Sequence, residues 1–356
     1  MTHLFSPLTL GATTLANRVA MAPMTRSRAV HHHAVNELTV TYYTQRASAG
    51  LIITEGTAPS ADGLGYARTP GIYTQEQINA WKRVTDAVHT KGGKIFVQLM
   101  HVGRIGHVLN KPEGSKIYAP SAIAAVGQMW TDKEGMKDNP TPQALSTEEI
   151  AATVADFAQA AQNAIEAGFD GIELHGANGY LLEQFLNPHS NQRTDNYGGS
   201  VENRTRFVLE VVDAAVAAVG RERVGIRFSP FGIFNDQPNY PEIEATYQHL
   251  ADELHTRGIV YIHLSDVSGS GARDDFFADL RRRFGGTVIV CGNYSKERAE
   301  KALQSGLADI VAFGRPFVAN PDLVERFKSG AEIAVPDANT FYTPDAKGYT
   351  DYPTLD

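Results

Sequence analysis

The sequence lacks the features that mark secreted, membrane-spanning and nucleic-acid-binding proteins. Its 356 residues include one cysteine, Cys291, so no disulfide can form within the chain, which favours a cytoplasmic location. No run of about 18 apolar residues occurs, and the first residues lack the basic and apolar regions of a signal peptide, so we expect no membrane association. Lys and Arg number 32 against 40 Asp and Glu, for a formal charge of −8. Basic residues are scattered apart from Arg281–Arg283, which argues against a nucleic-acid partner.

What the chain does contain is typical of a globular protein, with 42% hydrophobic and 20% charged residues. A usual size of about 150 residues per domain suggests two domains, but α/β barrels exceed that size as single domains. Length alone therefore does not decide the organisation. The order of strands and helices along the chain is the better guide.

Short apolar strands alternate with longer segments of helical periodicity. We predict strands at 18–21, 50–54, 94–99, 171–174, 224–228, 259–264, 287–290 and 309–313. We predict helices at 40–49, 74–90, 146–168, 201–219, 241–257, 273–283, after Ser295 and at 321–329, with a polar insertion over about 103–145. Eight such pairs indicate a single (β/α)8 TIM-barrel domain over residues 1–356 with an insertion after strand 3.

An open doubly wound sheet is the competing fold. That fold usually carries the dinucleotide-binding pattern G-x-G-x-x-G between its first strand and helix. The nearest match here is Gly269-Ser270-Gly271, where Asp274 stands in place of the third glycine. The missing pattern favours the closed barrel.

Polar residues that follow barrel strands share one face and point toward a common ligand. Gly292 and Asn293 precede the helix that opens at Ser295, and Gly314 and Arg315 follow the last strand. Glycine allows close approach of backbone N–H groups, and arginine can bind phosphate with two hydrogen bonds. These residues predict a site for a phosphorylated cofactor or substrate. The alternative is that the glycines only turn the chain and Arg315 forms a surface ion pair.

A second cluster follows the fourth strand, where His175, Asn178 and Tyr180 lie within six residues. Two hydrogen-bond donors and a phenol on one loop could polarise a carbonyl oxygen and protonate a neighbouring carbon. The alternative is a loop with a packed tyrosine and a hydrogen-bonded histidine. No metal-binding spacing such as H-E-x-x-H or C-x-x-C occurs, so no metal is expected.

Three other sites have two interpretations each. Arg227 lies within a strand, where an always-charged side chain needs an anionic cofactor ring or an internal carboxylate such as Glu55 or Glu173. Cys291 is interpreted as a small core residue rather than a nucleophile. The run His31–His33 is predicted to be a solvated loop, with adventitious metal binding as the second interpretation.

Several segments together resemble the old yellow enzyme family of FMN-dependent ene-reductases, especially the bacterial reductases of N-ethylmaleimide and nitrate esters. The resemblance covers nearly the whole chain and is most specific between residues 175 and 200. The segments that carry it are Met21–Arg26, Gln45–Glu55, Gln98–Arg104, His175–Leu182, Phe185–Pro188 and Arg193–Ser200.

The resemblance implies an NADPH-dependent enzyme, with NADH as the other possible donor, that reduces activated C=C bonds of α,β-unsaturated carbonyl or nitro compounds. FMN would be held non-covalently, and hydride would pass from NAD(P)H to the flavin N5 and then to the alkene. The donor would leave before the alkene enters the same pocket, and the oligomeric state would be a monomer or weak homodimer. The implied cofactor-binding residues are Pro23, Met24, Thr25, Gln98, Arg227, Gly292, Asn293, Gly314 and Arg315.

The resemblance also implies roles for the second cluster. His175 and Asn178 would donate hydrogen bonds to the substrate oxygen, and Tyr180 would protonate the α-carbon. Met100 and Tyr342 would complete the substrate pocket. Near relatives often carry tryptophan where Met100 stands, and the segment 30–37 departs from the family pattern.

Two other functions are compatible with a barrel that has a phosphate site. One is an aldolase or isomerase without flavin, which needs a lysine or a carboxylate base at a strand end. Lys94 begins its strand and no lysine ends one, which disfavours the aldolase. The other is a flavin carrier without activity, which predicts FMN binding without NADPH oxidation.

Overall fold

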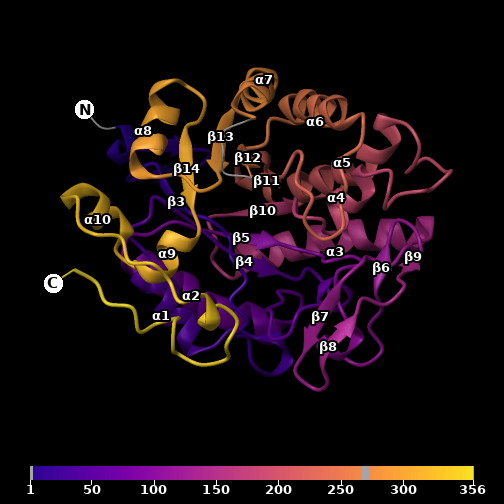
Figure 1. The fold of residues 1–356 in the computed structure, drawn as a ribbon, viewed down its shortest axis with the longest axis horizontal. Coiled ribbons are helices and arrows are strands. Elements are labelled where there is room, and N and C mark those ends of the chain that lie inside the picture. The colour runs from indigo at the N-terminus through magenta and orange to yellow at the C-terminus, as the bar shows by residue number, and fades with distance from the viewer. Residues whose placement is uncertain (1–2, 267–272, 356) are drawn as a thin grey trace.

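The computed structural model describes residues 3–266 and 273–355. Eight parallel strands close into a barrel in which each strand pairs with the strands before and after it along the chain. The predicted (β/α)8 fold is confirmed (Figure 1). The barrel strands are β3 (Val19–Met21), β4 (Leu51–Thr57), β5 (Ile95–Leu99), β10 (Gly171–Gly176), β11 (Val224–Phe228), β12 (Tyr261–Ser265), β13 (Thr287–Cys291) and β14 (Ile310–Phe313).

The predicted helices cover the outside of the barrel. Thr74 and Ser146 cap α2 and α3, since each side chain accepts a hydrogen bond from the backbone N–H three residues ahead. The first helix begins at Glu37 rather than at the predicted residue 40, because Asn36 caps it. The helices are α1 (Glu37–Gln45), α2 (Gln75–Thr90), α3 (Thr147–Glu166), α5 (Val201–Val219), α6 (Ile243–Arg257), α7 (Asp274–Phe284), α8 (Lys296–Gln304) and α10 (Leu323–Ser329).

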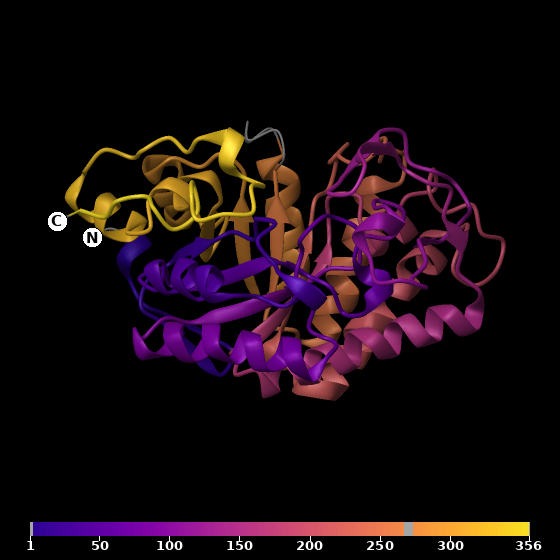
Figure 2. The ribbon, with the colours of Figure 1, turned by 90° about the horizontal axis from the view of Figure 1, so that it is seen from below.

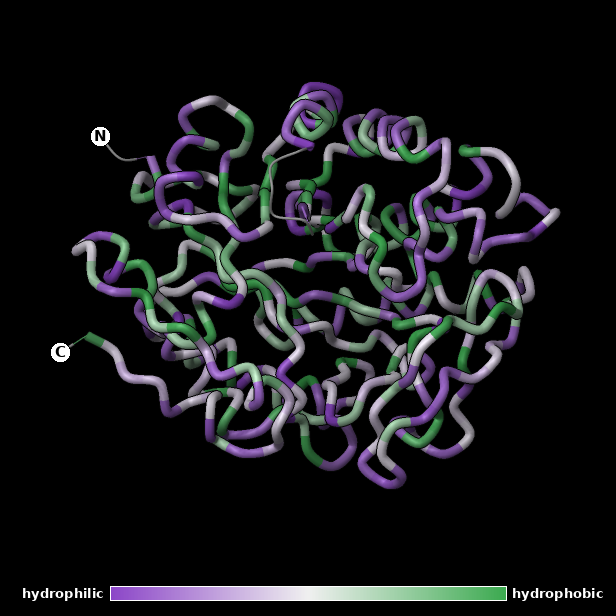
Figure 3. The backbone as a smooth tube through the Cα atoms, viewed as in Figure 1, coloured by the Kyte–Doolittle hydropathy of each residue, from purple (hydrophilic) through white to green (hydrophobic). Residues whose placement is uncertain are grey.

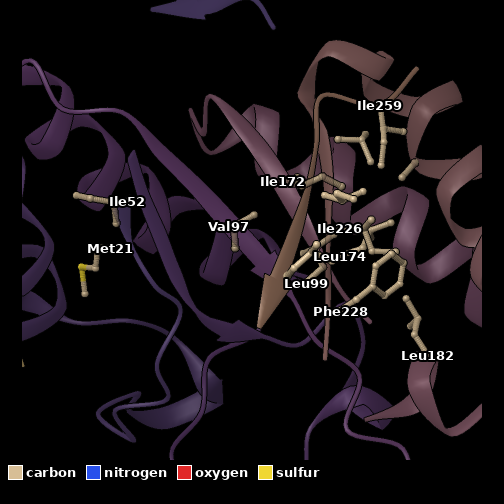
Figure 4. Close-up of a cluster of buried hydrophobic side chains, with 14 of the residues drawn as sticks. Met21, Ile52, Val97, Leu99, Ile172, Leu174, Leu182, Ile226, Phe228 and Ile259 are labelled. Carbon is tan, nitrogen blue, oxygen red and sulfur yellow. The ribbon is translucent and has the colours of Figure 1, made fainter. Parts of the chain in front are cut away.

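Strand residues that point away from the barrel axis form the main core with the helices. Ile52, Val97, Ile172 and Ile226 alternate with inward-pointing neighbours and are fully buried (Figure 4). Hydrophilic positions lie mainly on the outer loops and helix surfaces, while the central strands contain hydrophobic stretches (Figure 3). This burial explains why the barrel strands read as continuous apolar runs.

The inside of the barrel has an apolar floor. Phe96 and Tyr261 pack there with Leu10 and Leu15 of an N-terminal hairpin that the sequence did not predict. The hairpin consists of β1 (Leu8–Leu10) and β2 (Thr13–Leu15), and its turn at Gly11 lies against the backbone that precedes β11. It therefore closes the barrel at the amino ends of the strands.

The opposite end carries the long connections. The predicted insertion lies between β5 and α3 and contains η4 (Val108–Asn110), β6 (Tyr118–Ala119), β7 (Gln128–Thr131), β8 (Gly135–Asp138) and β9 (Gln143–Ala144). Figure 2 shows this insertion, in magenta, and the C-terminal segment, in yellow, on the same side of the molecule. Two short helices were not predicted, α4 (Leu181–Leu186) and α9 (Arg315–Ala319).

The remaining short elements are 3-10 turns. His31–His33 forms one of them, with His32 and His33 at φ 57° and 56°, and His31 and His32 are exposed, which agrees with the predicted solvated loop. No helix in the described residues is both long enough and apolar enough to cross a membrane. The other turns are η1 (His3–Phe5), η3 (Ala61–Gly63), η5 (Arg221–Arg223) and η6 (Ala338–Thr340).

Candidate active site

A cavity of about 1130 Å³ opens at the carboxyl ends of the barrel strands. Its wall combines strand ends with the β7–β8 hairpin and the C-terminal segment. Gly292, Asn293 and Gly314 are not among the described residues that line it. The structure brings together the other predicted site residues in this wall: Pro23, Met24, Thr25, Gln98, Met100, His175, Asn178, Tyr180, Arg227, Arg315 and Tyr342.

His175 is a neutral hydrogen-bond donor toward the cavity. Its Nδ1 accepts the backbone N–H of Ala177 at 3.3 Å, which leaves the proton of the neutral ring on Nε2. Burial and the nearby positive charge of Arg227 hold the pKa of His175 well below its ordinary value. The ring therefore stays neutral while it donates from Nε2.

Tyr180 keeps its phenolic proton over the whole physiological pH range. Burial raises its pKa well above 10, and the neighbouring Tyr66 raises it further. The two hydroxyl oxygens lie 3.0 Å apart, and the Tyr180 ring meets His175 edge-on with centroids 4.9 Å apart. Tyr66 stands in an insertion-facing loop without a motif, and so sequence reasoning missed it.

Below these groups lies a layer of buried polar residues on neighbouring strands. Glu173 accepts hydrogen bonds from Gln98 Nε2 at 2.8 Å, from the Tyr261 hydroxyl at 3.1 Å and from His263 Nδ1 at 2.8 Å. Burial acts to raise the pKa of Glu173, but the charge of His263 lowers it below its ordinary value. Burial likewise acts to lower the pKa of His263, but Glu173 raises it. Glu173 and His263 therefore form a buried ion pair.

Arg227 forms no direct ion pair with a carboxylate in the described part of the chain, although its charge helps to lower the pKa of the nearby Glu173. Among the described residues no Asp or Glu oxygen lies within 4.0 Å of its nitrogens, so the predicted alternative of a salt bridge to Glu55 or Glu173 is wrong. One terminal nitrogen donates to Ser265 Oγ at 3.3 Å, and Nε is buried without a partner. A buried cation with an unused donor fits an anionic ligand in the cavity. The flavin ring edge is such a ligand.

Cys291 packs, partly buried, against the apolar cluster inside the barrel, which agrees with its interpretation as a small core residue, and its thiol also faces the polar layer. Its Sγ is 3.9 Å from a terminal nitrogen of Arg227. Burial acts to raise the pKa of the thiol, but the neighbouring His263 and the charge of Arg227 bring it below its ordinary value. The sequence showed no helix end near the cysteine and could not reveal these two neighbours.

In the region predicted to bind phosphate, the backbone of Gly292 packs closely against the carbonyl of Asp266. Gly292 has φ +142°, and a Cβ there would lie 2.3 Å from the carbonyl oxygen of Asp266, so only glycine fits. Asn293 is exposed at φ 49° before Ser295, the residue that caps α8. Arg315 opens α9 after Gly314 and lines the cavity. These residues and Arg227 are chemically suited to the phosphate and ring of FMN.

Arg68 links three segments at the mouth of the cavity, which is otherwise lined mainly by apolar side chains. Its guanidinium donates to the Ser27 carbonyl at 3.0 Å and to the Tyr342 carbonyl at 2.8 Å, and it pairs with Asp132 of the hairpin. Arg68 was not predicted, because its three partners are distant in sequence. Apolar side chains that line the mouth and stay half exposed or more are Val126, Trp130, Met136, Phe234 and Tyr342.

Comparisons with known proteins agree with this geometry. The model of the NADH:flavin oxidoreductase / NADH oxidase family matches residues 3–333. The chain belongs to this family. It is the old yellow enzyme family that the motifs resemble, and so the predictions of family and of FMN-dependent alkene reduction are confirmed at this level.

Relatives and solved structures of this flavin oxidoreductase family match over nearly their whole length. A probable flavin mononucleotide-dependent alkene reductase of Leishmania infantum is 44% identical, with 99% of this chain and 97% of the relative covered. Chanoclavine-I aldehyde reductase of Penicillium roqueforti is 47% identical, with 99% and 96% covered. The structure of morphinone reductase is 49% identical with a TM-score of 0.95, covering 100% of this chain and 97% of that one.

No group of His, Cys, Asp and Glu within the described residues is arranged to hold a metal ion.

Proposed function

We propose that this protein is an NAD(P)H-dependent ene-reductase in which Arg227, Gln98 and Arg315 hold FMN and the His175, Asn178 and Tyr180 cluster activates the alkene. One observation carries the proposal. A neutral imidazole N–H donor and a protonated phenol line the same cavity as Arg227, a buried cation whose Nε has no hydrogen-bond partner among the described residues. When bound, FMN supplies the hydride chemistry.

The cofactor residues divide by chemistry. Arg227 and Gln98 suit the pyrimidine edge of the flavin, because a cation beside that edge stabilises the negative charge of the reduced ring. The amide of Gln98 already donates one N–H to Glu173, so its carbonyl oxygen is left for the N–H of the flavin ring. Thr25, Pro23 and Met24 line the cavity from the end of β3.

The phosphate is assigned to the ends of the last two barrel strands. Arg315, which lines the cavity, would supply the charge there, and Gly292, Asn293 and Gly314 would supply backbone N–H groups beside it.

The substrate residues act on the opposite ends of an activated double bond. His175 Nε2–H and the Asn178 amide donate to the carbonyl or nitro oxygen, where negative charge builds as the alkene accepts hydride. Tyr180 gives its proton to the α-carbon, and Tyr66 holds the hydroxyl from which that proton leaves. Met100 and Tyr342 line the same cavity and shape the room for the alkene.

The relatives support this substrate class. The matched proteins include 12-oxophytodienoate reductase 1 of Oryza sativa, which is 44% identical, with 99% of this chain and 93% of the relative covered. We include in the proposal NADPH as the donor, with NADH as the alternative, a single functional domain over residues 1–356, a monomer or weak homodimer, and a cytoplasmic location. Paired KM measurements for the two nucleotides and the elution volume on size exclusion test the donor and the assembly.

The decisive experiment is spectroscopic. The protein is refolded with FMN, freed of unbound flavin and reduced anaerobically with NADPH or NADH, and 2-cyclohexenone is then added. We expect flavin absorption bands that bleach with the nucleotide and return with the enone. A protein that holds no flavin contradicts the proposal and favours the aldolase or isomerase class. A protein that holds FMN but is reduced by neither nucleotide favours a flavin carrier.

A further inference from the structure

The turn that presents Asn178 and Tyr180 has a left-handed backbone. Asn178 and Gly179 are consecutive residues with φ 57° and 76°, a region that favours asparagine and glycine over other residues. The Asn178 carbonyl accepts from Asn235 Nδ2 at 2.8 Å, and the Gly179 carbonyl accepts from Gln184 Nε2 at 2.8 Å. Side chains from other segments therefore fix both carbonyls of the turn.

Glu183 fixes both N–H groups of the same turn. One carboxylate oxygen accepts the Gly179 N–H at 2.6 Å, and the Ser229 hydroxyl donates to the carboxylate at 3.0 Å. Ser229 Oγ in turn accepts the Asn178 N–H at 2.8 Å. Tyr247 donates its hydroxyl to the carboxylate at 2.8 Å. The carboxylate of Glu183 therefore accepts three hydrogen bonds. The one from Gly179 holds the turn directly, and the one from Ser229 holds it through the Asn178 N–H.

The carboxylate of Glu183 has no cationic partner within the described part of the chain. The ionisable groups packed around it are the phenols of Tyr247 on α6 and Tyr240 before α6, with Arg204 of α5 lying across the Tyr240 ring. Burial raises the pKa of Glu183 to about 7, although its three hydrogen bonds act to lower it. The phenols stay neutral there, because burial raises the pKa of Tyr247 well above 10 and that of Tyr240 to about 12.

Protonation of Glu183 conflicts with these contacts. A carboxylic acid carries one donor, so one oxygen site that accepted a hydrogen bond must now donate one. The hydroxyls of Ser229 and Tyr247 can rotate to accept that proton, but a rotated Ser229 no longer donates to Glu183 while it holds the Asn178 N–H. The backbone N–H of Gly179 cannot reverse. Even where Tyr247 takes the proton, the bonds from Gly179 and Ser229 then go to a neutral acid, and such bonds are weaker than bonds to a carboxylate, so the turn is held most firmly when Glu183 is ionised.

We propose that Glu183 is a positioning residue for alkene binding, whose carboxylate holds the Asn178–Gly179 turn so that Asn178 and Tyr180 meet the substrate oxygen and α-carbon. The inference rests on the proposed function of this cavity. Glu183 itself does not line the cavity, so it acts through the turn and not by contact with substrate or FMN.

The test measures binding to the oxidised, FMN-loaded protein without a hydride donor. 2-Cyclohexenone, which has no titrating group in this range, is titrated from about pH 8.5 to about pH 5.5 and followed by flavin absorbance. For the natural protein we expect Kd to rise by about five- to tenfold through pH 7, as for one lost hydrogen bond. His175 does not titrate in this window, because its pKa is far lower.

Three variants assign the effect to Glu183. E183Q should bind weakly at every pH, with the pH dependence lost and FMN retained. Y247F removes one donor from the carboxylate, so the midpoint of the Kd profile should move to higher pH. E210Q is the matched control, since Glu210 on α5 also accepts a tyrosine hydroxyl, from Tyr197 at 3.0 Å, and lies outside the cavity. It should leave Kd and its pH profile unchanged.

Each outcome decides between clear alternatives. An E183Q protein with the natural Kd and the natural pH profile overturns the inference. If E183Q does not fold, Y247F carries the test, and an unmoved midpoint overturns it. Burial also raises the pKa of Glu55 to about 7 and lowers that of Lys111 to about 7, so a pH profile that survives in E183Q overturns the assignment to Glu183. If the natural protein binds FMN but the enone never reoxidises it, the proposed function fails instead.

Discussion

Replacing His263 by leucine should expose how much the fold depends on the ion pair beneath the cavity. Both partners are fully buried, so His263→Leu leaves the Glu173 carboxylate charged in the interior with only Gln98 and Tyr261 as donors. Breaking a buried pair in this way reduces the free energy of unfolding by about 3–5 kcal/mol. With roughly 2.1 cal/mol/K of unfolding entropy per residue, the 356 residues convert this loss into a fall in Tm of about 4–7 °C.

The pH dependence of this loss has a definite sign. The pKa of His263 is raised by the pair, so its contribution to stability is complete below about pH 6.5 and is lost as pH rises through the folded-state pKa. The pKa of Glu173 is lowered, so its contribution is complete above about pH 4.5 and is lost as pH falls through its folded-state pKa. The natural protein should therefore exceed His263→Leu in stability most strongly between about pH 4.5 and 6.5.

The double variant E173Q/H263L provides the critical comparison. It removes the orphaned charge but keeps an acceptor for Gln98 and Tyr261, so it should be more stable than His263→Leu alone, by about 1–3 kcal/mol. Urea unfolding at two fixed FMN concentrations separates this effect from cofactor binding, which adds stability by mass action. The reasoning is refuted if His263→Leu reduces the free energy of unfolding by less than about 1 kcal/mol at every pH. It is also refuted if the loss in the double variant equals the sum of the losses in E173Q alone and His263→Leu alone.

Three further predictions concern the cavity. Tyr180→Phe should slow alkene reduction by about 10²–10⁴-fold and leave flavin reduction by the nucleotide nearly intact. Stopped-flow measurement of the two half-reactions checks this, and equal losses in both would mean that Tyr180 has a structural role. Arg315→Ala should weaken FMN binding by about 10–150-fold, as for one hydrogen bond between charged groups, measured by flavin titration of the apoprotein; an unchanged affinity removes Arg315 from the phosphate site. Arg68→Ala should speed proteolysis of the β7–β8 hairpin and raise KM for the alkene while FMN stays bound. The reason is that the contacts of Arg68 to Ser27, Asp132 and Tyr342 are lost together. Equal proteolysis rates in the natural protein and the variant would show that the hairpin keeps its place without Arg68.

Periodicity predicted the barrel because its signals are local. Each strand is a short buried run, and helix caps such as Thr74 and Ser146 mark where the following helices begin. The predicted strand at 224–228 agrees with β11 at both ends. Short elements were missed where tertiary contacts decide the structure. The hairpin β1–β2 and the helices α4 and α9 are too short to show a period, and they form against the barrel that supports them.

The site was predictable to the extent that strand ends reveal it. His175 and Arg227 follow from position, since residues at the carboxyl ends of barrel strands meet in one cavity. The partner of Glu173 did not follow, because Glu173 and His263 are 90 residues apart and neither stands in a motif. Glu183 was likewise hidden, since its partners come from three separate segments.

The hairpin at the floor of the barrel has a consequence for the order of events in catalysis. Leu10 and Leu15 fill the amino end of the barrel, while the cavity lies at the carboxyl ends of the strands. If FMN binds in this cavity as we propose, the nicotinamide and the alkene both have to reach it from the carboxyl end, and we expect them to take turns at the same place. Double-reciprocal plots should show parallel lines, and excess nucleotide should slow turnover by competing with the alkene for the reduced protein.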